Sequence, residues 1–447
     1  MAIIKKISPP KIILLGYMTI ILTGALLLCL PFASTKPGSC DFVTALFTAT
    51  SATCVTGLVV VDTAIEWTLF GQIVIMLLIQ IGGIGFMTIA LSLLALRNKS
   101  VDSATKSLMQ MSIGGSKLSG SQKLALIISM GTFSFEFIGA TLLALRFCPQ
   151  FGFWKGLYYS IFHAVSAFCN AGFDVLGKEF GPFSSFTTYS GDVYVCLIIL
   201  SLIVIGGIGF LVWTDVAENK YHFKRYKMNT KIVIITTLIL IVSGTIIAAA
   251  SEWNGALFQG RSISDKLIMS AFISVTPRTA GFNTVDMSLL HSTTYLLVVL
   301  LMAIGGSPGS TAGGVKTTAL ALVFLSIVSE FQGKDAVECF GRRIKSGAIK
   351  KVVCLITVFF SLIIIASALI CAIDGVALDA AIFETTSAIG TVGLSFGITP
   401  TLSNASRIIL ILLMYTGRVG GLTIILALSR HRKPYSSGYP EVEIIIG

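Results

Sequence analysis

The chain has 447 residues, of which 54% are hydrophobic and only 12% are Asp, Glu, Lys or Arg, with a formal net charge of +11. An ordinary soluble domain carries about 25% charged residues, so this composition excludes the soluble classes and indicates an integral membrane protein. No pattern of interleaved aromatic and basic residues is present, and no nucleic-acid partner is expected. The nine cysteines contain no C-x-x-C pair, so we expect free thiols and neither zinc nor disulfides.

Eight apolar segments are long enough to cross a lipid bilayer, which takes roughly 20 residues. They are 12–33, 67–96, 124–147, 193–214, 232–250, 293–327, 352–373 and 406–429. The first follows three lysines, as a secretory signal would, but seven further spans and the lack of a clear cleavage site favour a retained helix. An even number of spans places both termini on the same side of the membrane.

Basic residues gather on one side of this topology. Of the 32 Lys and Arg residues, 22 lie in the N-terminus and in segments 97–123, 216–231, 330–351 and 430–433. The positive-inside rule therefore places both termini on the cytoplasmic side of the cell membrane. Acidic residues are more frequent on the opposite side, where a negatively charged pore entrance would concentrate cations. For any single acidic residue, the alternative is an ordinary charged residue in a solvated loop.

One short phrase occurs four times at nearly equal intervals. A small, Ser/Thr/Ala-rich segment leads into a glycine followed by Leu or Phe. The copies are Ser51–Leu58, Ser166–Phe173, Ser274–Phe282 and Ser387–Leu394, and their glycines are 115, 109 and 112 residues apart. Each copy ends a segment too short to cross the membrane, at 42–52, 157–168, 266–275 and 378–388. Non-helical backbone at membrane depth survives only when it is buried in protein or lines a wet cavity, so we predict four re-entrant helices around a pore.

The predicted fold is an all-α integral membrane protein with four tandem span–pore-helix–span repeats, arranged pseudo-fourfold around one central pore. The repeats are 1–97, 98–216, 217–331 with an intramembrane gate loop, and 332–447 with a C-terminal tail. Asp41, Asp265 and Asp379 are expected as N-caps of three short helices. A short helix that enters from outside directs its carbonyl end, with roughly −0.5 of an elementary charge, toward the centre and favours a cation there.

The loops after the short helices are the predicted selectivity filter. Glycine permits backbone angles that turn carbonyl oxygens toward the axis, and rings of carbonyls replace the water shell of a selected cation. A helix-end glycine would explain one copy but not four at matched positions. The predicted filter residues are Thr53, Cys54, Val55, Thr56, Gly57, Phe168, Cys169, Asn170, Ala171, Gly172, Arg278, Thr279, Ala280, Gly281, Ile389, Gly390, Thr391, Val392 and Gly393. They are expected to bind K+ through backbone carbonyls, with Na+ as a candidate second ion and no organic cofactor.

The second span of each repeat carries a glycine pair: Gly82–Gly83, Gly206–Gly207, Gly305–Gly306 and Gly420–Gly421. The first two are interpreted as close helix packing by small residues. The third opens a stretch with five glycines and one proline, which cannot continue a helix, so a loop within the membrane is predicted. The predicted gate is Gly305, Gly306, Ser307, Pro308, Gly309, Ser310, Thr311, Ala312, Gly313, Gly314, Lys316 and Arg418.

Charged residues at membrane depth are functional hypotheses by default, because burying them is costly. Arg418 would create an electrostatic barrier to cations below the filter. For Arg278, the alternative interpretation is a structural role that stabilises the third filter loop. Glu136 and His163 are interpreted as packed, hydrogen-bonded residues. A membrane enzyme would need a nucleophile, a base or a metal set that converge on one face, and the sequence contains none, so no catalytic residue is assigned.

The four filter phrases, the stretch Gly305–Thr318 and the run Gly417–Gly421 together resemble the superfamily of potassium transporters that contains the Trk, Ktr and plant HKT proteins. The resemblance covers nearly the whole chain and is greatest for the membrane subunit of bacterial Ktr uptake systems. It implies K+ uptake through a channel-like, gated subunit and a homodimer docked on a cytosolic ring of nucleotide-binding RCK subunits of the KtrA kind. In plant relatives a serine at the first filter glycine accompanies sodium preference, so Gly57 favours potassium.

A second interpretation is a secondary transporter that couples the movement of its substrate to sodium or protons. Helices broken at the membrane midplane would fit that class, but the repeats predicted here share one orientation, which is less typical of it. Sodium dependence of K+ uptake is left open by the sequence.

Overall fold

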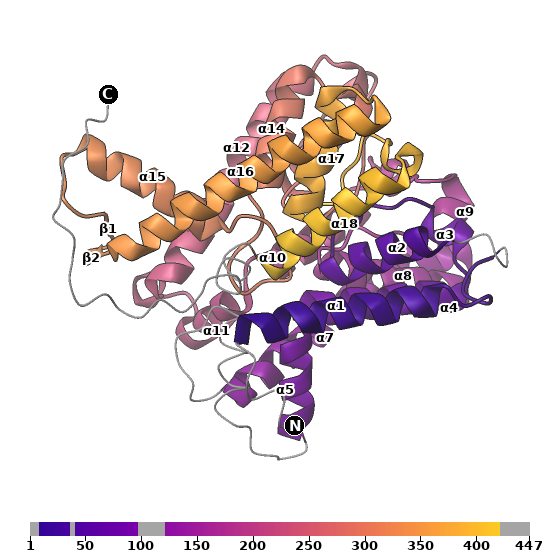
Figure 1. The fold of residues 1–447 in the computed structure, drawn as a ribbon, viewed down its shortest axis with the longest axis horizontal. Helices are drawn as coiled ribbons and strands as arrows, with labels where there is room; N and C mark the ends of the chain where they lie inside the picture. Colours follow the sequence, from indigo (N-terminus) through magenta and orange to yellow (C-terminus); the bar gives the residue numbers. More distant parts are fainter. Residues whose placement is uncertain (1–8, 36–40, 97–120, 421–447) are drawn as a thin grey trace.

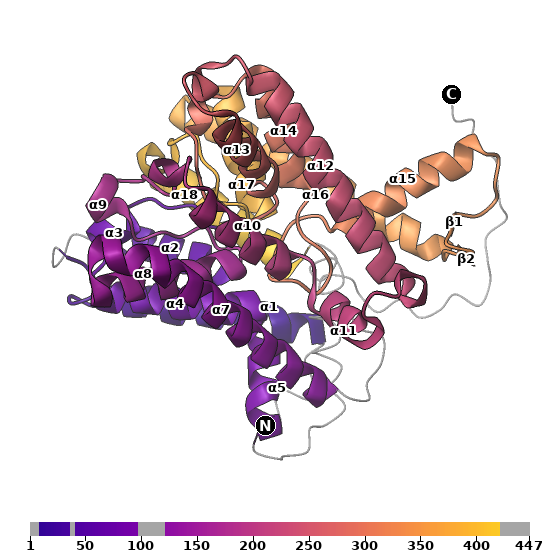
Figure 2. The same cartoon turned by 180° about the vertical axis from the view of Figure 1, so that it is seen from behind.

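The structure is a computed structural model, and it describes residues 9–35, 41–96 and 121–420. The described chain is mostly helical (Figures 1 and 2). The α-helices are α1 (Pro9–Leu28), α2 (Phe42–Cys54), α3 (Thr63–Glu66), α4 (Leu69–Ile84), α5 (Phe86–Leu96), α7 (Ser121–Phe151), α8 (Phe153–Phe168), α9 (Gly177–Phe180), α10 (Val193–Gly207), α11 (Phe210–Asn219), α12 (Met228–Glu252), α13 (Ile263–Val275), α14 (Ser292–Ala303), α15 (Thr317–Phe331), α16 (Ser346–Asp374), α17 (Leu378–Gly390) and α18 (Asn404–Val419). Strands β1 (Glu338–Cys339) and β2 (Arg342–Arg343) form an antiparallel hairpin.

Short 3-10 turns connect the helices at η2 (Thr187–Tyr189), η3 (Phe223–Arg225), η4 (Ala256–Phe258), η5 (Met287–Leu289) and η6 (Thr399–Thr401). The basic segment expected at 97–120 and the C-terminal tail lie outside the described residues, as does Gly421 of the fourth glycine pair.

Four helices of the described residues are each long and apolar enough to cross a membrane: α1, α7, α12 and α16. They overlap the first, third, fifth and seventh of the predicted spans. Their lengths of 20, 31, 25 and 29 residues match the roughly 20 residues that a bilayer requires. The first span of each predicted repeat is therefore one continuous helix.

The first two of the second spans are interrupted, which differs from the prediction, and the third is interrupted by the predicted loop. Helices α4 and α5 meet at 86°, and α10 and α11 meet at 94°. Helices α14 and α15 are separated by residues 304–316, and α18 ends at Val419. The ends of α4, α10 and α18 share a backbone conformation, with φ of 87°, 103° and 88° at Gly85, Gly209 and Gly420. Only glycine adopts such angles readily. Helices α4 and α10 contain the first two glycine pairs and end at or just after them, so the prediction of single spans at 67–96 and 193–214 was wrong.

The segments predicted to be too short to span contain helices α2, α8, α13 and α17. Asp41 caps α2, and its Oδ1 accepts a hydrogen bond from the Thr44 amide at 2.8 Å. The expected caps of the other two helices were wrong: Ser262 caps α13, and the residue before α17 is Ala377, which makes no side-chain cap. Asp265 and Asp379 lie instead in the first turns, where a negative charge still favours the helix dipole.

The short helices pack in a closed cyclic order. Each lies between two helices of its own segment of the chain, as α2 lies between α1 and α4. Each also contacts the helix that precedes it in the cycle: α4 packs on α8, α10 on α13, α14 on α17, and α18 on α2. The last contact brings the C-terminal end of the described chain against its N-terminal part, and α18 and α1 lie near each other in Figure 1.

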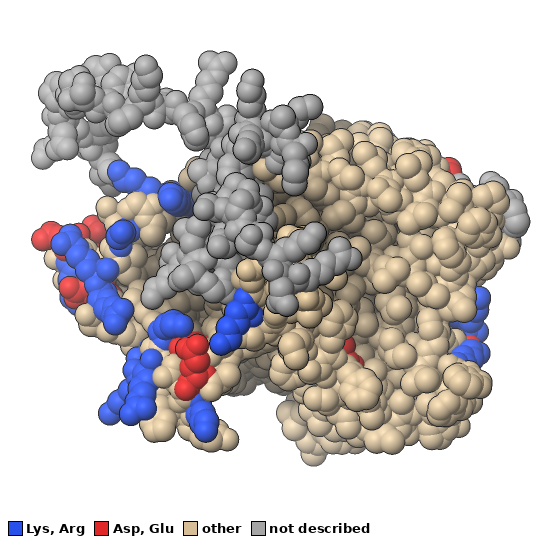
Figure 3. Space-filling model, turned by 90° about the horizontal axis from the view of Figure 1, so that it is seen from below, with Lys and Arg blue, Asp and Glu red and all other residues tan. Residues whose placement is uncertain are grey.

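One arm extends from this assembly. Helix α15, the hairpin and the first turns of α16 project away from the other helices in both views (Figures 1 and 2). Lys and Arg side chains gather at this end of the molecule, and a smaller group lies at the opposite end (Figure 3). The uneven distribution matches the one-sided charge predicted from the sequence.

Candidate functional site

The four glycine-bearing loops share one backbone conformation. The residue two positions before each glycine has a left-handed φ: 57° at Val55, 59° at Asn170, 70° at Thr279 and 53° at Thr391. The glycines themselves have φ of 92°, 69°, 79° and 91° in chain order. A left-handed conformation is a genuine outlier for a β-branched residue and costs about 1–3 kcal/mol. Val55, Thr279 and Thr391 are β-branched, whereas Asn170 tolerates this conformation, so the strain recurs in three loops and the backbone geometry in all four.

The four glycines meet one another in a ring. A Cβ on Gly57 would lie 2.5 Å from the carbonyl oxygen of Ala171, the residue that precedes Gly172. The same relation holds from Gly172 to Ala280 at 2.8 Å, from Gly281 to Val392 at 2.5 Å and from Gly393 to Thr56 at 2.2 Å. Each loop therefore turns a carbonyl oxygen against the glycine of its neighbour in one rotational sense, and the fourth loop closes onto the first. Real Cβ atoms do not approach oxygen this closely, so only glycine fits without a shift.

Hydroxyl groups at the ends of the short helices hold the loops. The Oγ atoms of Ser51 and Ser387 accept hydrogen bonds from the amides of Gly57 and Gly393, at 3.1 and 3.0 Å. In the other two loops, Ser166 and Thr276 donate instead to the carbonyl of the residue after the glycine, both at 2.7 Å. The Ser or Thr that recurs in the four phrases thus has a local structural role.

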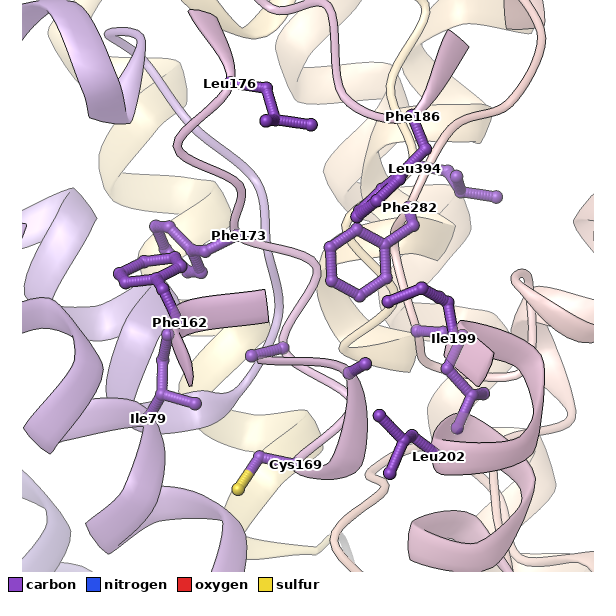
Figure 4. Close-up of a cluster of buried hydrophobic side chains, with 14 of the residues drawn as sticks. Ile79, Phe162, Cys169, Phe173, Leu176, Phe186, Ile199, Leu202, Phe282 and Leu394 are labelled. Atoms are coloured by element: carbon purple, nitrogen blue, oxygen red, sulfur yellow. The ribbon is translucent and has the colours of Figure 1, made fainter. Parts of the chain in front are cut away.

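The Leu or Phe after each glycine anchors its loop in the core. Leu58, Phe173, Phe282 and Leu394 are all at most 1% exposed. Figure 4 shows Phe282 beside Phe186, with ring centroids 5.2 Å apart, and Phe173 and Leu394 in the same buried cluster. The glycine and the large apolar residue therefore act together. The glycine permits the close approach between neighbouring loops, and the apolar residue holds its loop in the position where that approach occurs.

A cavity of about 540 Å³ opens above the ring. All four glycines line it, together with three aspartates: Asp62, Asp174 and Asp286. None of the described residues that line it is Lys, Arg or His. Burial, reinforced by the nearby charge of Asp62, raises the pKa of Asp174 to about 7. An acidic cavity over a ring of carbonyls suits a cation.

All predicted filter residues are buried, but their carbonyls do not all face the ring. The oxygens of Thr53, Phe168 and Ile389 each lie 2.0 Å from where a Cβ of a second-span glycine would stand. Those glycines are Gly82, Gly206 and Gly417. These three carbonyls thus contact α4, α10 and α18, and the glycines of these helices pack closely, as expected, immediately before the breaks.

This packing also corrects the register of the fourth glycine pair. Gly417, not Gly420, takes the position of Gly82 and Gly206, because it faces the matching carbonyl. Gly420 corresponds instead to the break glycines Gly85 and Gly209. Arg418 therefore stands at the position that Gly83 and Gly207 occupy in the first two second spans.

The predicted gate residues form a compact loop, residues 304–316, between α14 and α15. Ile304 and Val315 pair as a parallel bridge, and the Gly305 amide donates to the Val315 carbonyl at 2.9 Å. The loop docks on the break between α10 and α11. There the Ser307 amide donates to the carbonyl of Gly207 at 3.0 Å, and the Phe210 amide donates to Gly309 at 2.7 Å. The interruption of α10 thus frees the backbone groups that hold the loop.

Two cations bind the carbonyls of this loop. Arg418 donates to the carbonyl of Thr311 and to those of Gly82 and Gly83, the last at 3.2 Å. Lys316 folds back, and its Nζ donates to Ala312 at 2.8 Å and Gly313 at 3.1 Å. The guanidinium therefore connects the loop to α4, and the ammonium stabilises the loop internally.

The remaining polar residues singled out from the sequence lie around the ring. Arg278 is 7% exposed, and its Nε has no partner among the described residues. Glu136 accepts from Gln80 Nε2 at 3.0 Å, and His163 Nδ1 lies 2.7 Å from the Tyr159 carbonyl. Both predicted hydrogen-bonded residues are confirmed as such.

Sequence reasoning missed several contacts that position the site. Gly85 and Gly209 end helices, and the signal was available: both stand three residues after a glycine that packs on a short helix. Two loop contacts with the filter have no such signal. The Thr311 hydroxyl donates to the Phe168 carbonyl at 3.3 Å, and Gly313 packs on Thr391. The sequence places the three aspartates of the cavity only on the outer side of the membrane and does not predict that they line one cavity.

Comparisons with known proteins agree with these observations. A family model described as "TrkH: Cation transport protein" matches residues 16–438. The potassium/sodium uptake protein NtpJ of Enterococcus hirae is 38% identical over 450 residues, which cover 99% of this chain and 98% of that protein. The Ktr system potassium uptake protein B of Bacillus subtilis is 37% identical over 443 residues, covering 99% and 97%. The crystal structure of the potassium transporter TrkH from Vibrio parahaemolyticus has a TM-score of 0.70 at 19% identity and covers 93% of this chain and 84% of that chain, which shows a shared fold.

Proposed function

The chain belongs to the TrkH family of cation transport proteins, and we propose that it is the gated, K+-conducting subunit of a Ktr-type uptake system. The family and the long apolar helices support a membrane transport protein rather than an enzyme. The names of its relatives specify potassium uptake, and one of them specifies sodium as well. Potassium is the proposed substrate, and a channel-like pore is the proposed mechanism.

The ring of four glycines at the floor of an acidic cavity carries this proposal. Four loops that each present a carbonyl to the next would surround an ion with oxygen atoms at a narrow point. The short helices behind them end at the ring, so the negative ends of their dipoles favour a cation. The aspartates above would raise the local cation concentration before entry.

The cyclic packing supports the four-repeat arrangement. We assign the repeats as 1–97, 98–216, 217–331 and 332–447, each a span, a pore helix and an interrupted span around one pseudo-fourfold axis. We keep all the predicted filter residues in the proposed filter, but we assign K+ binding to only some of their carbonyls. The carbonyls of Thr56, Ala171, Ala280 and Val392 are the proposed K+ ligands, whereas Thr53, Phe168 and Ile389 support the loops from behind.

Loop 304–316 is the proposed gate. It docks against the helix break at Gly209 and contacts the filter loops from the side opposite the acidic cavity. Arg418, which binds both this loop and α4, adds a fixed positive charge to the same side. At an effective dielectric of about 20, two unit charges about 4 Å apart interact by about 4 kcal/mol, enough to oppose K+ passage by orders of magnitude.

The proposed assembly is a homodimer in the cell membrane with both termini in the cytoplasm. The basic end that carries the hairpin and α11 would face the cytoplasm, following the positive-inside rule (Figure 3). A cytosolic RCK-type ring of nucleotide-binding subunits would control loop 304–316 from that side. The name of the Ktr system supports a partner, because it describes a multi-component system.

The test is cation flux into vesicles that contain the purified protein. We expect K+ uptake down its gradient, exceeding Na+ uptake, and stimulation by a cosupplied RCK-type ring. Uptake of K+ against its gradient that is driven by sodium or protons would instead support a coupled transporter. A third arm with K+ and varied external Na+ measures sodium dependence. Vesicles that take up neither ion, although the protein is folded and inserted, would contradict the proposal.

A further inference from the structure

Loop 304–316 directly contacts the fourth filter loop. A Cβ on Gly313 would lie 2.1 Å from Oγ1 and 2.9 Å from Cγ2 of Thr391, and a Cβ on Gly314 would lie 3.2 Å from the Gly390 carbonyl. Thr391 is 0% exposed, and its hydroxyl has no hydrogen-bond partner among the described residues. The contact is therefore steric: a segment proposed to move packs against a side chain of the filter.

Thr391 needs such support because its backbone is strained. It is β-branched and has φ of 53°, a conformation that persists only when the surroundings enforce it. The matched residues of the other loops are held by different neighbours. Val55 packs its Cγ2 against Gly82 of α4, and Thr279 lies 3.3 Å from the Asn170 amide. Thr391 makes the equivalent contact with α18, because its Cγ2 lies 3.1 Å from where a Cβ of Gly417 would stand. Gly313 is therefore an additional neighbour, which links the fourth loop, but not Val55 of the first, to loop 304–316.

We propose that Thr391 is a positioning residue that makes the K+ affinity of the filter depend on the position of loop 304–316. While the loop is docked, Gly313 holds Thr391 in the left-handed conformation, and the Val392 carbonyl stays at the ring. When the loop moves away, the fourth filter loop relaxes and K+ binds more weakly. Opening would then also release the ion toward the inner side. This inference rests on the function proposed above.

The linkage is reciprocal, as it must be for any two coupled binding equilibria. An ion bound at the ring favours the conformation of Thr391 that docks Gly313, so K+ in the filter also favours the closed loop. A glycine at position 391 would break the link, since glycine occupies the left-handed region without support. Because Thr391 belongs to the filter, the K+ affinity of this variant is measured first, and the effect of the loop is compared within each background.

The experiment measures K+ binding to the purified full-length protein by calorimetric titration with KCl in a buffer free of other alkali ions. Deletion of Gly309–Gly313 is expected to weaken K+ affinity about tenfold, which corresponds to about 1.4 kcal/mol. In a Thr391→Gly background the same deletion should change the affinity by less than about twofold. Val55→Gly is the matched control, because it relieves the same strain at a site that loop 304–316 does not support, and there the tenfold loss should remain.

A point substitution repeats the test without a deletion. Gly313→Ala places a methyl group against Thr391 and is expected to weaken K+ binding, whereas in Thr391→Gly the clash has no partner and the effect should vanish. A melting curve of each variant shows that it is folded. The inference is overturned if loop deletion and Gly313→Ala leave K+ affinity unchanged, or if Val55→Gly removes the loop dependence as fully as Thr391→Gly. Absence of K+ binding by the unaltered protein would contradict the proposed function itself.

Discussion

Arg418 and Gly83 stand 335 positions apart in the chain, yet Nη2 of Arg418 donates a hydrogen bond to the Gly83 carbonyl at 3.2 Å. The same guanidinium binds the carbonyls of Gly82 and Thr311. Arg418 occupies the position that is glycine in the first two second spans, so one long cation fills the space below the ring. It therefore joins the last described helix, α4 and loop 304–316, and any movement of the loop must break its contact with Thr311.

Arg418→Ala should raise K+ flux and reduce its dependence on a cytosolic partner. The substitution removes both the hydrogen bond to the loop and a positive charge that opposes K+, so an increase of about tenfold or more is expected. Arg418→Lys should have an intermediate effect, because an ammonium keeps the charge but not the planar fork that reaches three carbonyls. Flux into vesicles is the measurement. Arg407→Ala, at the other end of α18, is the control, since Arg407 binds Pro400 and Asn404 instead.

Each filter glycine should tolerate substitution poorly. Gly57→Ser, Gly172→Ser, Gly281→Ser and Gly393→Ser would each place a Cβ 2.2–2.8 Å from a neighbouring carbonyl oxygen, so the ring must widen. The ratio of K+ to Na+ flux should fall at least several-fold in each, and Gly57→Ser should favour Na+ most. Gly260→Ala is the control, because Gly260 also has a positive φ of 72° but nothing lies within 4 Å of its Cβ position. Unchanged selectivity in all four variants would disprove the ring as the filter.

The sequence predicts the positions of the site better than its contacts. Four phrases with matched glycines were enough to locate four short helices and their loops, because such loops need a glycine and a buried Leu or Phe at fixed spacing. The length and polarity of the long helices are equally direct consequences of the bilayer. The distribution of Lys and Arg between the loops predicts the orientation in the membrane by the same kind of argument.

What the sequence could not supply is the geometry between segments far apart in the chain. The glycine pairs at Gly82 and Gly206 were interpreted as helix packing. A further glycine three positions later was a visible signal, but the break itself depends on the backbone angles at Gly85 and Gly209. In the fourth second span, Arg418 replaces the second glycine of the pair, so the correct alignment of this span with the first two could not be recognised from the sequence. The direction of the Thr53 carbonyl, toward Gly82 and away from the ring, likewise depends on packing that no spacing encodes.

Gly209→Ala should loosen the gate, whereas Gly85→Ala should not. Both glycines end helices with similar angles, so either substitution costs about 1–3 kcal/mol of strain. Gly209, however, also packs on loop 304–316, where its Cβ would lie 2.8 Å from the Pro308 carbonyl. The nearest atom to a Cβ on Gly85 is Thr88 Oγ1 at 3.9 Å. K+ flux should rise several-fold in Gly209→Ala, and both variants should melt at lower temperature. Equal flux in the two variants would remove the break at Gly209 from the gating mechanism.

Uptake at low external K+ should increase as the outer pH rises from 6 to 8. Burial, together with Asp62, raises the pKa of Asp174 to about 7, so this carboxyl is mostly protonated at pH 6 and mostly ionised at pH 8. Ionisation adds a negative charge to the cavity above the ring. A unit charge about 10 Å from an ion contributes roughly 0.4 kcal/mol at a dielectric of about 80 and roughly 1.7 kcal/mol at about 20. The apparent K+ affinity should therefore improve several-fold.

Asp174→Asn tests the origin of this pH dependence. Its uptake should be nearly independent of pH between 6 and 8 and should match the low-pH behaviour of the unaltered protein. Asp286→Asn is the matched control, because Asp286 lines the same cavity but is exposed, and its variant should keep the pH dependence. Stability supplies a second readout. A carboxyl with a raised pKa destabilises the folded state progressively as pH rises toward 7, so Asp174→Asn should melt at a higher temperature than the unaltered protein at pH 8. If Asp286→Asn, and not Asp174→Asn, abolishes the pH dependence, the exposed carboxylate rather than the buried one governs cation entry.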